Sequence, residues 1–221
     1  MKTRMARFAG ALAVLLLLST AGPAHAILLE PGESQTYNFE VPGRPGFTAT
    51  VEITLVSITT SQIVFDIDVT NTSSDSSGVI TSFGFEINSG AVVTGGSISD
   101  IGGATDVDVF TTLTANDDLT GNFPDMDFCA FPNQCVGGNV NNGLDPGQTD
   151  LFRITADGTF NGEFTDIVLT AMKFQTDPDS FEIPGTPGDG GGGSAEVPVP
   201  ATLILLGAGL VGMAALSRLG R

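Results

Sequence analysis

Apolar and polar residues alternate along several runs of this chain. In the run 47–58, Val51, Ile53 and Leu55 fall on one side of an extended backbone, and the residues between them are polar. An alternation with a period of two is typical of β-strands that bury one face and expose the other. The same reasoning predicts further strands over the runs 62–70, 83–87, 149–155 and 166–176.

Turn-forming residues separate these runs. Pairs or clusters of Gly, Asn, Asp and Ser fall at 71–78, 89–90, 95–96, 102–103, 157–158 and 161–162. Short strands, frequent turns and no helical window of useful length between 27 and 183 favour an all-β protein. We therefore expect one domain over 27–183, an antiparallel immunoglobulin-like β-sandwich.

The first 26 residues have the organisation of a secretory signal peptide. Three basic residues precede an apolar run at 8–18, and Ala24-His25-Ala26 follows it. Small residues at Ala24 and Ala26 are what a signal peptidase recognises, so cleavage after Ala26 is expected. The alternative is an uncleaved membrane anchor, but the apolar run is short for that role.

The C-terminal part of the chain changes composition twice. Residues 184–196 are rich in Gly and Pro and cannot bury a core, so they are predicted to form a linker. The run 201–217 is uncharged and apolar, and Arg218 and Arg221 follow it. At about 1.5 Å per residue, a helix over this run is roughly 25 Å long and can span a thin bilayer.

The net charge of the predicted domain limits the partners that it could bind. Between 27 and 196 the chain has 25 acidic and only three basic residues, a net charge of −22. Nucleic acid and anionic membrane surfaces would be repelled, so neither is expected to bind this domain. The acidic composition suits solubility and divalent cations.

The only two cysteines are six positions apart. In an exported chain Cys129 and Cys135 are expected to form a disulfide. The only histidine, His25, leaves with the signal peptide, so neither a zinc site nor a histidine-dependent catalytic triad can be built. A glycosidase-like carboxylate pair from Asp125, Asp127 or Glu86 is the alternative, but a solvated acidic face is the simpler interpretation, and we predict no catalytic residues.

Acidic residues also gather in a loop-rich stretch that could bind calcium. Calcium takes six to eight oxygen ligands from flexible loops. The stretch has no EF-hand spacing, and Asp, Asn and Gly are equally what turns require. The candidate ligands are Asp106, Asp108, Asp117, Asp118, Asp125 and Asp127, with Asn139, Asn141, Asn142 and Asp145 nearby in the sequence.

The sequence also bears on sugar binding and on dinucleotide binding. Sugar-binding platforms usually need exposed Trp or Tyr, and this chain has no Trp and one tyrosine, Tyr37. Polysaccharide binding through polar loops stays open. The sequence GAGLVG at 207–212 matches a dinucleotide fingerprint, but the chain ends nine residues later, so these glycines belong to the predicted membrane helix.

The tail resembles a known sorting signal. Val197-Pro198-Val199-Pro200-Ala201, the apolar run and the terminal arginines resemble the PEP-CTERM signal in order, spacing and position. This chain departs from the usual motif at Val199, where a glutamate is common, and has only two arginines. The resemblance implies a Gram-negative envelope protein, transiently anchored in the inner membrane and cut near 198–201 by an exosortase. Such proteins are associated with extracellular polysaccharide and biofilm matrix.

These observations predict an exported, non-catalytic surface or matrix protein. The domain over 27–183 would be structural or adhesive, and its processing partners would be signal peptidase and exosortase. The membrane would be contacted only through the C-terminal helix. The alternative is that the same sandwich is a specific binding module for calcium or for polysaccharide.

Overall fold

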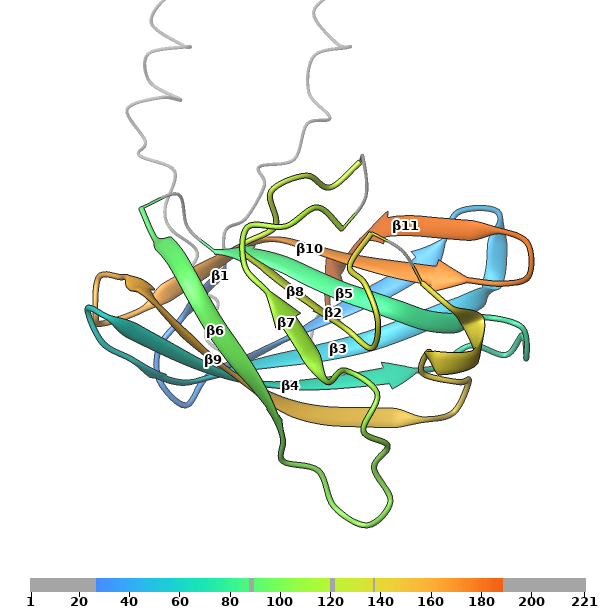
Figure 1. Cartoon of the computed structure of the whole chain (residues 1–221), viewed down its shortest axis with the longest axis horizontal. Helices are drawn as coiled ribbons and strands as arrows, with labels where there is room; N and C mark the ends of the chain where they lie inside the picture. Colours follow the sequence, from blue (N-terminus) through green and yellow to red (C-terminus); the bar gives the residue numbers. More distant parts are fainter. Residues whose placement is uncertain (1–26, 88–89, 120–121, 137, 189–221) are drawn as a thin grey trace, which may run out of the picture.

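A computed structural model describes residues 27–87, 90–119, 122–136 and 138–188. Over these residues the chain is all-β, with two antiparallel six-stranded sheets and one short 3-10 turn, η1 (Val140–Asn142). The predicted all-β class and the two packed sheets are therefore confirmed (Figure 1).

Sheet 1 contains the long strands. Its order is β12-β2-β3-β4-β9-β6. The strands are β2 (Ser34–Val41), β3 (Arg44–Ile58), β4 (Gln62–Asn71), β6 (Val92–Asp100), β9 (Thr149–Thr159) and β12 (Thr186–Pro187).

Sheet 2 has the order β1-β10-β5-β8-β7, with β11 also paired to β10. Its strands are β1 (Ile27–Leu29), β5 (Val79–Ile87), β7 (Thr112–Thr114), β8 (Phe128–Phe131), β10 (Thr165–Gln175) and β11 (Ser180–Pro184).

The alternating apolar residues of the sequence form the core-facing side of sheet 1. Val51 pairs with Val69 and Leu55 with Phe65 across β3 and β4, and all four side chains are buried. Aromatic rings join the two sheets: the Phe65 ring lies edge-on to Phe85 at 5.3 Å between centroids. Such edge-to-face pairs stabilise a core beyond the area that they bury.

The central strand of sheet 2, β5, is buried on both of its faces. Every residue of β5 except Glu86 is buried, so the simple alternation of the sequence describes only the face toward sheet 1. The segments before and after β8 fold over the face of β5 that points away from sheet 1. They form a second small core, the outer cluster, from Leu119, Met126, Cys129, Phe131, Cys135 and Ala171.

The disulfide lies inside this outer cluster. Cys129 and Cys135 are bonded, as predicted, and both are almost fully buried. The loop that they close is tied to sheet 2, because Lys173 Nζ donates to the Val136 carbonyl and Ser82 Oγ donates to the Cys135 carbonyl. Lys173 Nζ also lies 3.6 Å from Glu182 Oε1. The disulfide therefore holds a cover on sheet 2.

Several predicted segments lie outside the described residues. These are the signal peptide (1–26), most of the linker and the whole tail (197–221). Within the described ranges, no helix is long and apolar enough to cross a membrane. Thr186 and Pro187 pair with Asn38 and Tyr37, so strand pairing continues into the predicted linker.

Replacing both Cys129 and Cys135 with Ala should lower the free energy of unfolding by about 2 kcal/mol, because the unfolded chain regains the entropy of a seven-residue loop. Urea unfolding with and without reductant measures this. The reductant should destabilise the wild type and leave the double variant unchanged. Equal stability of the two chains under oxidising conditions would contradict the structural role.

Gly84→Val should destabilise the domain by about 1–3 kcal/mol, because a Cβ at Gly84 would lie 3.0 Å from the Phe128 carbonyl oxygen and 3.2 Å from Leu119 Cδ1. Gly95→Val is the matched control, since nothing lies within 4 Å of its Cβ position. Thermal unfolding compares the two. Similar losses in both variants would mean that the outer cluster tolerates added volume.

Candidate functional site

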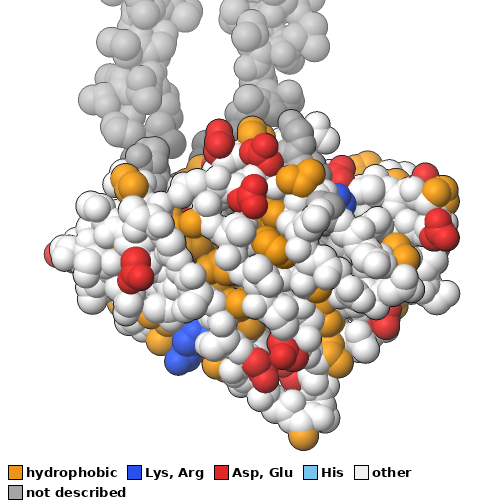
Figure 2. All heavy atoms as spheres, in the orientation of Figure 1, with side chains coloured by type: hydrophobic (Ala, Val, Ile, Leu, Met, Phe, Trp, Pro, Cys, Tyr) orange, Lys and Arg blue, Asp and Glu red, His pale blue; other side chains and the backbone are white. Residues whose placement is uncertain are grey.

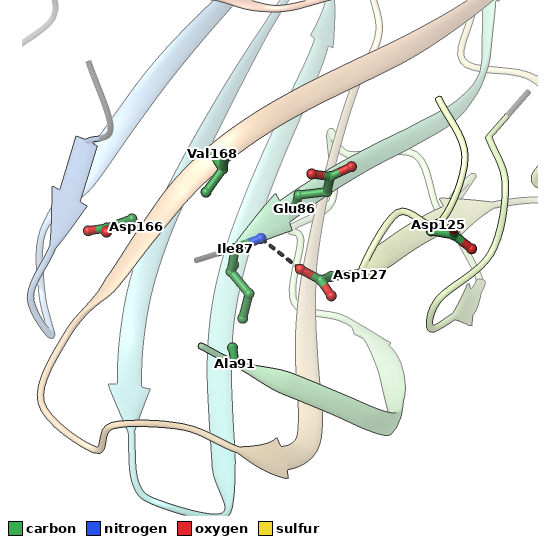
Figure 3. A pocket seen from close by; sticks show the side chains of 7 residues that line it. All are labelled: Glu86, Ile87, Ala91, Asp125, Asp127, Asp166 and Val168. Carbon is green, nitrogen blue, oxygen red and sulfur yellow. Dashed lines mark hydrogen bonds between the residues drawn. The ribbon is translucent and has the colours of Figure 1, made fainter. Parts of the chain in front are cut away.

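A hollow of about 450 Å³ opens where β5 ends and β8 begins. We call it the acidic hollow (Figure 3). It is the first candidate site because acidic and apolar side chains from three separate segments meet there. Its lining residues are Glu86, Ile87, Ala91, Asp125, Asp127, Asp166 and Val168.

Strand pairing explains this arrangement. Phe85 pairs with Phe128, so Glu86 at the end of β5 comes close to Asp127, which precedes β8. Asp127 Oδ2 accepts a hydrogen bond of 2.9 Å from the Ile87 backbone N–H (Figure 3). The register of β10 against β5 shifts between Ile167 and Leu169, and Val168 between them is exposed.

Burial, more than charge repulsion, raises the pKa of three carboxyl groups in the acidic hollow. Burial raises the pKa of Glu86, and repulsion from Asp127 and Asp125 raises it further. Burial also raises the pKa of Asp127, although the hydrogen bond from Ile87 opposes this. Burial raises the pKa of Asp166 as well. The described lining has four acidic residues and no basic one, so it disfavours an anionic ligand.

All three residues that the sequence offered for a carboxylate pair line this hollow, but only two of them lie close together. Glu86 and Asp127 come from adjoining strand ends, whereas Asp125 lies on the hairpin before β8 and is turned away from Glu86 (Figure 3). Asp125 also has a positive φ of 56°, which fits a turn position. The arrangement is an acidic surface hollow with one carboxylate, Asp127, committed to the backbone.

The six calcium candidates fall in two separate places. Asp106 and Asp108 lie in the loop after β6, and the other four lie in the hairpin before β8. Asp106 Oδ1 accepts from the Leu151 N–H, and Asp118 Oδ1 accepts from the Asp125 N–H. Asp117 accepts from Thr114 Oγ1 and from the Asp118 N–H. These carboxylates therefore stabilise loops and turns.

The structure contains no assembled metal centre in the parts of the chain that it describes: no group of three or more His, Cys, Asp or Glu side chains there could hold an ion. Asn139 Oδ1 accepts from the Asn141 N–H and begins η1. Asp145 forms a turn with Gln148. Calcium binding stays a prediction from composition.

Asp150 is a buried acid that the sequence reasoning missed. Its side chain is 1% exposed, and Oδ2 accepts hydrogen bonds from the N–H groups of Val109 (2.8 Å) and Phe110 (2.6 Å). Burial raises its pKa to about 6, against the opposing effect of these two bonds. The sequence did contain a sign of this burial: Asp150 lies in β9 on the same core-facing side as Phe152 and Ile154.

The other residues singled out in the sequence are Tyr37 and the residues of the two predicted processing sites. Tyr37 is 3% exposed and packs in the main core, so it offers no sugar platform. Ala24, Ala26 and the motif from Val197 to Ala201 lie outside the described residues.

Comparisons with protein-family models, with curated proteins and with solved structures found no match for this chain.

Asp150→Asn should reduce the dependence of stability on pH. The pKa of Asp150 in the folded state is about 6, above its ordinary value of 3.8, so the folded state binds the proton more tightly than the unfolded state. The stability that this proton contributes is present at pH 4 and is lost as the pH rises toward 6 and above. Asn keeps an acceptor oxygen for Val109 and Phe110 but has no charge to bury.

Urea unfolding of the wild type and Asp150→Asn at pH 4 and pH 7 measures this effect. The wild type should lose stability, relative to the variant, by on the order of 2 kcal/mol over that range. Asp157→Asn is the control, because Asp157 is an exposed residue of the same strand, β9. Parallel pH profiles for wild type and Asp150→Asn would contradict the assignment.

Proposed function

We propose that this chain is an exported, non-catalytic protein of the cell surface or extracellular matrix of a Gram-negative bacterium. It acts as a structural or adhesive component of exopolysaccharide or biofilm. Signal peptidase removes residues 1–26, and an exosortase recognises the tail at 197–221. An immunoglobulin-like sandwich is the part that remains outside the cell.

The buried disulfide is the structural observation that carries this proposal. Disulfides persist in oxidising compartments outside the cytoplasm, and Cys129–Cys135 lies within a packed cluster. It therefore supports the export that residues 1–26 predict. The motif from Val197 to Ala201 then supports a specific route after export.

The ends of the described domain support attachment at one edge. β1 leads into β2 through a turn at Glu30–Glu33, and the Gly188 N–H donates to the Thr36 carbonyl of β2. The C-terminal end of the described domain therefore lies next to β2, and the N-terminal strand β1 lies at the edge of sheet 2, paired with β10. A tail leaving next to β2 would hold the domain on one side and leave the opposite side free for contacts.

Surface charge supports contact with neutral or cationic matter outside the cell. Acidic side chains are spread over much of the face in Figure 2, and basic ones are few. This surface disfavours nucleic acid and anionic lipid, so the tail is the only proposed membrane contact. Salt outside the cell would screen repulsion between copies.

The absence of histidine from the mature chain favours a non-catalytic role. The carboxylates of the acidic hollow have raised pKa values from burial, but structural acids show such shifts as well. A specific binding module for calcium or for polysaccharide is the second candidate. The acidic hollow favours the polysaccharide, because sugar hydroxyl groups could donate to its carboxylates.

Mass spectrometry of the intact protein from its host tests the sorting proposal. We expect a mature species that starts at Ile27 and lacks most of 201–221. Replacing Pro198 and Pro200 together with Ala should block this processing, and Val199→Glu should preserve it. Ser194→Ala, in the predicted linker, is the control and should be processed normally.

Retention of residues 201–221 in all of the wild-type protein would show that the tail is a plain anchor. Normal processing of the double proline variant would show that the motif is not what the enzyme reads.

A further inference from the structure

Strand β6 is the longest edge strand in the described part of the chain. It is the last strand of sheet 1 and is paired there with β9 (Figure 1). The other edge strands are short: β1 and β7 have three residues each, β12 has two, and β11 has five and ends at Pro184. Short strands and prolines prevent the edge of a sheet from pairing with another chain. β6 has nine residues and no proline, so its edge lacks both of these protections.

The first part of β6 shows which way its backbone groups point. Gly158 of β9 donates its N–H to the Ser61 carbonyl, on the side of β9 that faces β4. Val93 lies opposite Gly158, so the backbone groups of Val93 point away from β9. The Val93 carbonyl accordingly accepts a hydrogen bond of 2.8 Å from Asn116 Nδ2. Asn116 therefore closes this end of the edge.

The second part of β6 has an open edge. The Ile101 N–H donates to the Leu151 carbonyl of β9, so the backbone groups of Asp100, the residue before it, point away from β9. Backbone groups alternate in direction along an antiparallel strand, so those of Ile98 and Gly96 also point away. Among the described residues no strand is paired with this side of β6.

The open edge is accessible to solvent. Gly96 lies opposite the buried Ala156, and a Cβ on Gly96 would come 3.0 Å from Leu113 Cδ2, so its core side is covered. Gly96 is nevertheless exposed, and because it has no side chain the exposed part is backbone. Ser97 and Ser99, which follow it, are exposed as well. The edge over 96–100 is thus available for pairing.

The charge of β6 indicates which partner fits. The run 92–99 has no charged residue, although the chain between 27 and 196 has a net charge of −22. A cationic partner would find no carboxylate on this edge before Asp100, and an anionic partner would be repelled by the rest of the domain. The edge therefore suits an uncharged strand. The same edge of a second copy is uncharged over the same length.

We propose that two copies of this chain pair through β6, antiparallel and related by a two-fold axis. Ile98 lies opposite Ile98 of the second copy, Gly96 opposite Asp100 of the second copy, and Ser97 opposite Ser99 of the second copy. All the outward backbone groups over 96–100 then find partners. This register also keeps the two Asp100 side chains apart, since like charges directly opposite each other are destabilising.

The pairing joins sheet 1 of the two copies into one continuous sheet. One pair of strands buries little surface, so the contact is weak in dilute solution. It gains strength where the chains are held close together, because the effective concentration is then high. The proposal goes beyond the proposed function, since it depends on the domain alone and not on sorting of the tail.

Sedimentation velocity of the full-length chain in detergent tests the proposal. Over concentrations from about 1 μM to 1 mM, the wild type should show an equilibrium of monomer and dimer with a Kd on the order of 100 μM. Two double variants test the register. They are the acid variant, Ser97→Asp with Ser99→Asp, and the lysine variant, Ser97→Lys with Ser99→Lys.

Each double variant puts like charges opposite each other, so each should self-associate at least about tenfold more weakly than the wild type. An equal mixture of the two should form a dimer again, because opposite charges then face each other. If the lysine variant fails to fold, because Ser99 lies opposite Arg153 of β9, Ser97→Lys alone replaces it.

The matched controls carry the same substitutions at Ser74 and Ser76, two exposed serines with the same spacing in the loop after β4. They change the net charge equally and should self-associate as the wild type does.

Three results would overturn the proposal. They are a wild type that is monomeric at every concentration, β6 variants that associate as strongly as their controls, and a mixture that associates no more tightly than either variant alone. Association through the tail would give the second result. None of these results bears on processing of the tail, so the sorting proposal stands or falls separately.

Discussion

The aromatic layer between the two sheets is the interaction on which the rest of the domain depends. Phe65 projects from sheet 1 and meets Phe85 and Phe128 of sheet 2, at 5.3 and 5.9 Å between ring centroids. Phe85 and Phe128 also stack on each other at 4.6 Å. These contacts fix β5 and β8 in register, and the acidic hollow is built where those two strands meet.

Coverage of sheet 2 is the second constraint. Burying both faces of β5 requires a small residue where the cover approaches, and Gly84 meets this need. It also requires that polar groups under the cover find partners, which Ser82 and Lys173 do through loop carbonyls. Among the described residues, Thr81 Oγ1 and Gln175 Oε1 have no hydrogen-bond partner, and both lie beside Gly138. The hollow lined by Gly138 and Gln175 lies where the cover ends.

The large excess of acid is used in several distinct ways. Asp66 forms a two-bond ion pair with Arg153, at 2.6 and 2.8 Å. Asp150 is buried on backbone N–H groups, and Asp106, Asp117 and Asp118 hold loops. The carboxylates left on the surface give the domain its charge. The sequence shows only that the composition is acidic. The fold divides the acidic residues into those that stabilise loops and strands and those that are exposed.

From the sequence alone the all-β class, the strands β3, β4, β5, β9 and β10 and the disulfide could be predicted, because alternation and cysteine count depend on local chemistry. The strands β2 and β6 were missed, and the glycines at 95–96 and 157–158, predicted to form turns, lie within β6 and β9. The sequence also determined the predictions about both ends of the chain, which lie outside the described residues. The burial of β5 on both faces, the burial of Asp150 and the approach of Glu86 to Asp127 became visible in the folded domain. These features arise from pairings between residues that are distant in the chain. A pattern of period two describes one face of one strand and carries no information about what covers the other.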